Sequence, residues 1–159
     1  DKEYWAVVLG RPAEASGTVE APIQQHPRRK ERMRIHAGGR PAVTAWELLE
    51  SWAGYSLLRC RPLTGRRHQL RLHLTHAGLP LAVDPLYGSG QGIYLSRLKP
   101  GYRRSRTHRE YPLIGRLSLH ARSVSLAHPR TGEPLTVTAE PPKDFRATIN
   151  QLRRLADAD

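Results

Sequence analysis

The feature that most constrains the fold is the alternation of apolar and polar side chains along short segments bounded by glycine and proline. The first segment, residues 1–10, reads as a strand with apolar side chains on both faces, Tyr4, Ala6 and Val8 on one and Trp5, Val7 and Leu9 on the other. Similar short strands are predicted at residues 18–23, 33–37, 43–49, 55–61, 118–127 and 134–139. A Gly38-Gly39 turn would pair residues 33–37 with residues 43–49, and Ala53-Gly54 would turn the chain into residues 55–61. These segments predict a mainly antiparallel sheet.

One internal segment has the period of an α-helix instead. Between Thr64 and Gly78, apolar side chains recur at Leu70, Leu74 and Ala77, which is the spacing of one helix face. Thr64 suits the N-cap position of such a helix, and Gly78 suits the position just after its end. The sequence therefore predicts a helix across this segment that packs on the sheet.

The C-terminal tail predicts a second helix. Pro141-Pro142 stops the last strand, and the following residues 144–156 carry one apolar stripe made of Phe145, Ile149, Leu152 and Leu155. Residues 88–110 show no clear period, so we expect a mobile surface loop there, without a buried apolar face. We predict a single α+β domain over residues 1–159, with a mainly antiparallel mixed sheet and a few helices.

The charge of the chain predicts an anionic partner. Lys plus Arg number 26 against 14 Asp plus Glu, a formal net charge of +12. The excess is clustered in residues 26–40, where only Glu31 opposes it, and in residues 97–109, where no acid occurs. Nucleic acid is the first candidate and an anionic membrane the second, while a charge that only aids solubility is the third. No apolar run is long enough to span a membrane, and no long basic amphipathic helix is present.

The predicted internal helix concentrates positive charge where it is least favourable. Arg66, Arg67 and Arg71 would lie in its first two turns, where the helix dipole is already positive. Phosphates or a carboxylate at this end would turn that cost into binding. A metal is a weaker interpretation, because His73 and His76 lack nearby acidic ligands and Cys60 is the only cysteine.

The stretch TGRRHQLRLHL, followed by DPLYG, resembles a segment of the RluA family of RNA pseudouridine synthases. The opening KEYWAVVLG is similar to the Lys-x-Tyr-x-Ala-x-Val-x-Gly pattern of the same family. Three weaker similarities follow in the same order, namely GTVEAPI, GGRPAVT and RLSLHARSVSLAHPRTGEPLTV. The resemblance therefore covers most of the chain and implies the α+β fold and the uridine-isomerising activity of that family.

The resemblance also implies roles for single residues. Tyr4 would stack on the target uracil, Leu70 would lie against the base, and Arg71 would pair with the catalytic aspartate. An arginine beside a carboxylate in an apolar pocket keeps that carboxylate ionised and oriented. No cofactor is expected, because the reaction is an internal rearrangement.

The predicted RNA-contacting side chains lie in the basic clusters and around the internal helix. They are Arg28, Arg29, Lys30, Arg32, Arg66, Arg67, His68, Gln69, His73, Arg103, Arg104 and Arg106. Ribosomal or transfer RNA is the expected partner, and the cytoplasm the expected location.

The chain lacks one part of the family's pattern. The nucleophilic aspartate of the family lies in a His-Arg-Leu-Asp motif that does not occur here, and Asp84 belongs to the DPLYG element, which shapes a loop in that family. We therefore expect a domain truncated at its N-terminal side, with a split protein or a degenerate relative as alternatives, and no activity from this chain alone. The other function left open is a non-catalytic RNA-binding or ribosome-associated module.

Overall fold

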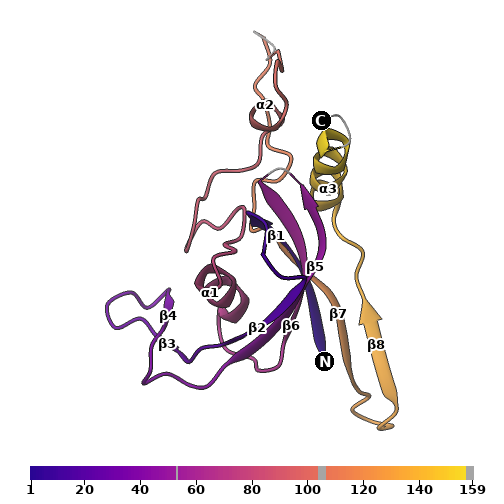
Figure 1. Ribbon diagram of the computed structural model, residues 1–159. Coiled ribbons are helices and arrows are strands. Elements are labelled where there is room, and N and C mark those ends of the chain that lie inside the picture. The colour runs from indigo at the N-terminus through magenta and orange to yellow at the C-terminus, as the bar shows by residue number, and fades with distance from the viewer. Residues whose placement is uncertain (53, 104–106, 157–159) are drawn as a thin grey trace.

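The backbone is organised around one six-stranded sheet. The computed structural model describes residues 1–52, 54–103 and 107–156, and its sheet has the strand order β2-β5-β6-β1-β7-β8 (Figure 1). The strands are β1 Lys2–Leu9, β2 Ser16–Glu20, β3 Ile23–Gln25, β4 Met33–Ile35, β5 Val43–Trp52, β6 Tyr55–Pro62, β7 Leu119–Ala127 and β8 Pro134–Thr138. The helices are α1 Gln69–His76, α2 Leu95–Leu98 and α3 Lys143–Ala156. All strand pairings among the described residues are antiparallel, which confirms the predicted α+β class.

Strand β1 lies inside the sheet, with neighbours on both edges and a covered surface on both faces. It pairs with β6 along one edge and with β7 along the other, and its residues Ala6, Val7 and Val8 are fully buried. Successive side chains of a strand point to opposite faces, so Ala6 and Val8 meet one layer and Val7 meets the other. The alternation predicted for residues 1–10 is confirmed.

Helix α1 covers one face of the sheet. Leu70 and Leu74 pack there with Ala6 and Val8 of β1 and with Leu58 of β6. The helix is followed by Gly78 with φ 75°, a left-handed conformation that a glycine adopts without strain. The predicted end of the helix is confirmed.

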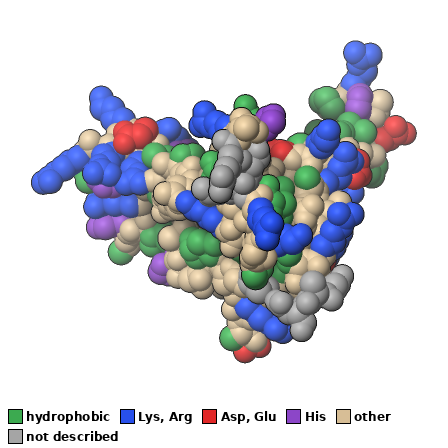
Figure 2. Space-filling view, turned by 90° about the horizontal axis from the view of Figure 1, so that it is seen from above, with side chains coloured by type: hydrophobic (Ala, Val, Ile, Leu, Met, Phe, Trp, Pro, Cys, Tyr) green, Lys and Arg blue, Asp and Glu red, His purple; other side chains and the backbone are tan. Residues whose placement is uncertain are grey.

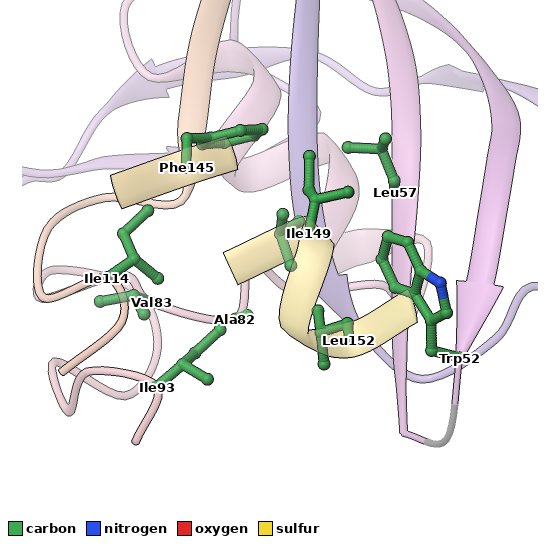
Figure 3. Packing of buried hydrophobic residues seen from close by; sticks show 10 residues of the cluster. Trp52, Leu57, Ala82, Val83, Ile93, Ile114, Phe145, Ile149 and Leu152 are labelled. Atoms are coloured by element: carbon green, nitrogen blue, oxygen red, sulfur yellow. The ribbon is translucent and has the colours of Figure 1, made fainter. Parts of the chain in front are cut away.

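Helix α3 covers the opposite face (Figure 3). Phe145, Ile149 and Leu152 are buried against Val7 and Leu57 of the sheet. They lie at the i, i+4 and i+7 positions of one helix face, so the stripe predicted for the tail is confirmed for these three residues, while Leu155 is only half-buried. At about 25 cal/mol per Å² of apolar area, burial of side chains this large stabilises the fold by about 1.5–3 kcal/mol each.

The segment predicted as a mobile loop contributes to this same core. Ile93 and Ile114 are buried in the cluster beneath α3, and a backbone bridge links them. Leu98, in α2, packs against the cluster from its edge. The expectation that residues 88–110 contain no buried apolar face is therefore wrong, because Ile93 of this range is buried and is bridged to Ile114, which lies just beyond it.

The pairing predicted through Gly38-Gly39 is also wrong. Strand β4 pairs with β3, Met33 facing Gln25, and the two form a separate hairpin that projects from the sheet (Figure 1). The chain passes directly over Ile23 at Gly39, where a Cβ atom would lie 2.6 Å from the Ile23 carbonyl carbon. Glycine is required there by a close approach of two backbone segments, not by a hairpin turn.

Within the described residues, no helix is long and apolar enough to cross a membrane.

Candidate active site

A cavity of about 250 Å³ opens beside the N-terminal end of α1. Its lining includes Tyr4 from β1 and His68, Leu70 and Arg71 from the start of α1. Tyr4 reaches it because it shares the α1-facing side of β1 with Ala6 and Val8. The structure therefore brings together the three residues predicted to be catalytic, Tyr4, Leu70 and Arg71, in one concave site.

The start of α1 is held in place by the side chain of Gln69. This residue is only 4% exposed, and its amide nitrogen donates to the Val43 carbonyl and to Thr44 Oγ1. Its amide oxygen accepts from Thr64 Oγ1 and from the Arg66 backbone N–H. These bonds keep the preceding residues in a turn, so the helix begins at Gln69 and Thr64 is not its N-cap. The predicted start at Thr64 was wrong for this reason.

His73 is a second internal anchor of the same helix. It is fully buried, with one ring nitrogen 2.9 Å from Thr44 Oγ1 and the other 2.9 Å from the Ala21 carbonyl oxygen. Burial lowers its pKa, although the bond to Ala21 opposes the shift. The polar groups of Gln69 and His73 thus bond to other parts of the protein, and both side chains are buried, which corrects the prediction that they contact RNA.

The guanidinium of Arg71 binds the carboxylate of Asp84 through two nitrogens. Nε donates to Oδ2 at 2.9 Å and Nη2 donates to Oδ1. The side chains are 15% and 3% exposed, so the pair is largely withdrawn from water. Burial raises the pKa of Asp84, but the bonds from Arg71 and from the Tyr87 and Leu86 N–H groups outweigh it and leave that pKa below its usual range.

This pair resolves the charge problem noted in the sequence. Arg71 lies in the first turn of α1, and the anion that compensates it within the described residues is the Asp84 carboxylate. Arg71 was predicted to pair with a catalytic aspartate, and its observed partner belongs instead to the DPLYG element. Nη1 takes no part in the Asp84 pair, and Arg71 still lines the cavity, so its guanidinium has N–H donors for a second anionic group.

A basic hairpin stands next to the cavity. We call residues 23–35, which comprise β3, β4 and their connection, the basic arm. Arg28, Arg29 and Lys30 are exposed at its tip, and Arg32 is half-buried. Figure 2 shows Lys and Arg side chains gathered on the left of the view, where Figure 1 places this hairpin.

Two more predicted residues join the arm to the cavity. Arg67 donates to the carbonyl oxygens of Lys30 and Glu31 in the arm, at 3.3 Å and 3.4 Å. Arg66 donates from Nε to the Pro41 carbonyl at 3.0 Å and also lines the cavity. The arginines predicted around α1 therefore extend one basic surface from the arm to the cavity.

The basic cluster predicted at residues 97–109 lies far along the sequence from the arm and from α1. Arg103 is exposed in the segment that follows α2, and Arg104 and Arg106 lie outside the described residues. Their predicted contact with RNA stays a prediction.

The chain is similar in sequence to RNA pseudouridylate synthases. A model of the RNA pseudouridylate synthase family matches residues 1–76. An uncharacterized RNA pseudouridine synthase of Chloroflexus aurantiacus is 41% identical over 152 residues, covering 96% of this chain and 42% of the relative. The ribosomal large subunit pseudouridine synthase D of Escherichia coli K12 is 36% identical over 159 residues, covering 96% of this chain and 44% of that enzyme.

Solved structures agree with this similarity. The human RNA pseudouridylate synthase domain containing 4 superimposes with a TM-score of 0.69 and 28% identity, over 96% of this chain and 62% of that one. This chain belongs to the RNA pseudouridylate synthase family. It spans less than half of the length of the curated relatives that it matches.

The candidate site contains two residues whose importance was not predicted from the sequence. Asp84 was assigned only a loop-shaping role, and Tyr87 of the same DPLYG element was assigned none. Tyr87 lies 4.9 Å from the Arg71 guanidinium, measured to its ring centroid. Its hydroxyl oxygen lies 2.7 Å from His68 Nδ1. The DPLYG motif itself could have indicated a turn that Asp84 opens and that contains Tyr87. The partners of these two side chains, which include Arg71 and His68, lie in another segment of the chain and could not be predicted from the motif.

Proposed function

We propose that this chain forms the substrate pocket and RNA-binding surface of an enzyme that isomerises uridine to pseudouridine in ribosomal or transfer RNA of the cytoplasm. The observation that carries the proposal is the convergence of Tyr4, Leu70 and Arg71 on one cavity beside the basic arm. If Tyr4 were an ordinary strand residue and Arg71 a solvated helix residue, we would not expect both to line the same cavity as Leu70.

The cavity offers the surfaces that an extruded base requires. The Tyr4 ring offers a face for stacking and the Leu70 side chain an apolar wall, and base–aromatic stacking contributes about 1–3 kcal/mol per base. A uridine inside a helix must leave its stack before a protein can act on it, and contacts to the flanking phosphates offset that cost. The basic arm and Arg66 supply the positive charge for those phosphates.

The reaction needs a nucleophilic carboxylate. In the family this is the aspartate of the His-Arg-Leu-Asp motif, which does not occur in this sequence. Pseudouridine formation breaks the bond between uracil N1 and the ribose, rotates the base and joins C5 to the ribose. The C5 hydrogen leaves as a proton and N1 takes up a proton, so the product is an isomer of uridine. No atom is supplied by a cofactor. Arg71 would hold an incoming nucleophilic carboxylate with the N–H donors that Asp84 leaves free, while Asp84 fixes the guanidinium plane.

The alternative is a non-catalytic RNA-binding module of the same fold. It is favoured by one observation, the Arg71–Asp84 pair, which already provides Arg71 with a carboxylate. Both functions predict RNA binding, and only the enzyme predicts turnover.

The experiment measures tritium release from ribosomal RNA labelled at uridine C5. We expect the 159-residue chain alone to bind the RNA and to release no tritium. The reading frame upstream of Asp1 is then read for a His-Arg-Leu-Asp motif, and the longer protein that includes it should release tritium. Absence of that motif, or a longer protein that binds RNA without turnover, would leave the binding module as the function.

Variants of the longer protein test the assigned roles. Arg71→Ala should lower turnover by about 100-fold or more, and Arg71→Lys by less, because lysine keeps the positive charge but loses the planar fork. Tyr4→Phe should reduce turnover more than RNA affinity, because stacking survives the loss of the hydroxyl. Normal turnover by the Arg71→Ala protein, or tritium release by the 159-residue chain, would contradict the mechanism.

A further inference from the structure

The side chain of Tyr87 lies where the basic arm meets the cavity. Its hydroxyl oxygen accepts the backbone N–H of Met33 in β4 at 2.7 Å. The same oxygen lies 2.7 Å from Nδ1 of His68, the residue that precedes α1. The guanidinium groups of Arg71 and Arg32 lie over its ring, at 4.9 Å and 5.4 Å from the centroid. One side chain thus touches the arm, the start of α1 and Arg71.

The hydrogen bonds at this hydroxyl join His68 to the basic arm. A backbone N–H can only donate, so the Tyr87 oxygen accepts from Met33. The bond to His68 Nδ1 is donated by the Tyr87 O–H when the imidazole is neutral and protonated on Nε2, and by the ring when Nδ1 carries the hydrogen. Burial and the charges of Arg71 and Arg67 lower the pKa of His68, which agrees with the neutral form.

His68 needs such a partner because its backbone is strained. Its φ of 57° is left-handed, and it is the one non-glycine residue with positive φ in the described part of the chain. Side chains with a Cβ adopt this region at a cost and persist there where surrounding contacts impose it. The bond to Tyr87 is a contact that holds the residue in this conformation.

The position of Tyr87 is itself set by the carboxylate that binds Arg71. Asp84 Oδ1 accepts the N–H groups of Leu86 and Tyr87, at 2.9 Å and 3.0 Å, while the same side chain binds Arg71. A displacement of the Tyr87 ring is therefore transmitted to the carboxylate that orients Arg71.

We propose that Tyr87 is a positioning residue that couples the basic arm to Arg71, so that the place of the arm on RNA and the geometry of the cavity are set together. The coupling is a property of the protein without RNA. Its use during RNA recognition rests on the function proposed above. Arg67 forms a second link between the arm and the start of α1, and it reaches the arm tip through Lys30 and Glu31.

The first experiment compares Tyr87→Phe with the unchanged 159-residue chain by NMR. Phenylalanine keeps the ring under Arg71 and Arg32 and removes only the hydroxyl. We expect the Met33 amide to exchange with solvent at least about 10-fold faster, and the Arg71 Nε–H resonance to shift. Tyr111→Phe, at a residue 79% exposed, is the matched control and should change neither. Unchanged Met33 exchange and an unmoved Arg71 resonance in Tyr87→Phe would overturn the proposal.

A second measurement needs no variant. The ¹⁵N shifts of the His68 ring report its tautomer and whether Nδ1 is hydrogen-bonded, and the proposal requires a hydrogen bond between Nδ1 and the Tyr87 hydroxyl. An Nδ1 atom without a hydrogen bond would show that Tyr87 does not hold the start of α1 and would also overturn the proposal.

RNA binding then separates the two proposals. With a ribosomal RNA fragment as probe, Arg28→Ala should weaken binding several-fold in the unchanged chain and by less in Tyr87→Phe, where the arm is already released. Equal losses in the two backgrounds would overturn the coupling and leave the proposed function intact. If neither protein binds the RNA while Tyr87→Phe still loosens Met33 and moves Arg71, the proposed function fails and the coupling stands.

Discussion

The two faces of the sheet are covered by helices that are held in different ways. Helix α3 buries the apolar side chains of Phe145, Ile149 and Leu152. The Arg116–Asp144 and Arg153–Glu50 ion pairs also join it to the rest of the chain, but they lie at the partly exposed surface. The site side of α1 is held by directed polar contacts through Gln69, His73 and the Arg71–Asp84 pair. Apolar contacts adapt to small displacements, whereas a buried polar group that loses its partner has no substitute. The candidate site is therefore built on the face where a displaced side chain costs more free energy.

The largest effect should come from breaking the Arg71–Asp84 pair. Asp84→Asn keeps the shape but leaves the largely buried Arg71 charge without its carboxylate, so we expect a loss of about 3–5 kcal/mol in the free energy of unfolding. Glu47→Gln is the control, because its pair with Arg59 is partly exposed, at 49% and 31% for the two side chains. It should cost no more than about 1 kcal/mol. Urea unfolding measures the free energy of unfolding of both variants. Similar losses in the two would show that the Arg71–Asp84 pair contributes no more to stability than an exposed ion pair.

The same contrast can be sharpened from the apolar face. Phe145→Ala leaves a cavity under α3 and should cost about 3–5 kcal/mol of unfolding free energy. It should leave RNA affinity unchanged at temperatures where the variant is folded, whereas Asp84→Asn should weaken it. Filter binding with a ribosomal RNA fragment checks this. A Phe145→Ala protein that is folded and yet binds RNA poorly would show that the two faces are not independent.

Acid should act on the polar face first. The pKa values of His68 and His73 are lowered in the folded protein, mainly by burial. Below about pH 6.5 the unfolded chain takes up protons that the folded chain refuses, so stability should fall as the pH drops from about 6.5 through the lowered pKa values. Above about pH 7 these two residues contribute no pH dependence.

A variant series measures that dependence. Unfolding free energy is determined at several pH values for the unchanged chain, for His73→Gln and for His76→Gln, an exposed histidine of the same helix. The slope against pH should flatten in His73→Gln and persist in His76→Gln. A slope that persists in both variants would show that His73 is not a source of the acid sensitivity.

The smallest effect concerns the basic surface. If about six phosphates are neutralised, the logarithm of RNA affinity should fall with the logarithm of salt concentration with a slope of about −4 to −5. Arg67→Ala should reduce the size of that slope by about 1, whereas Arg130→Ala, an exposed residue in the turn before β8, should leave it unchanged. A flat salt response would contradict RNA binding through phosphates, and equal slopes for the two variants would place the RNA elsewhere.

Sequence patterns predicted the strands and helices better than they predicted which strands pair and which side chains meet. The strand at residues 1–10, the helix stop at Gly78 and the stripe of α3 were all confirmed. The start of α1 was predicted too early, because the turn before it is imposed by the buried Gln69 side chain. The pairing of β4 was wrong, because the close approach of Gly39 to Ile23 leaves β4 beside β3.

The features that follow from the sequence alone are therefore local or periodic. The alternation of β1, the apolar stripe of α3 and the charge of the arm depend on residues a few positions apart, and backbone geometry alone translates such spacing into faces. The resemblance of short motifs also directed attention to Tyr4, Leu70 and Arg71. Tertiary structure alone decided that Arg71 pairs with Asp84 and that Tyr87 bonds to Met33, 54 positions away in the chain. Those contacts depend on how α1, the DPLYG turn and the basic arm pack together, and no periodicity within one segment records the packing of another.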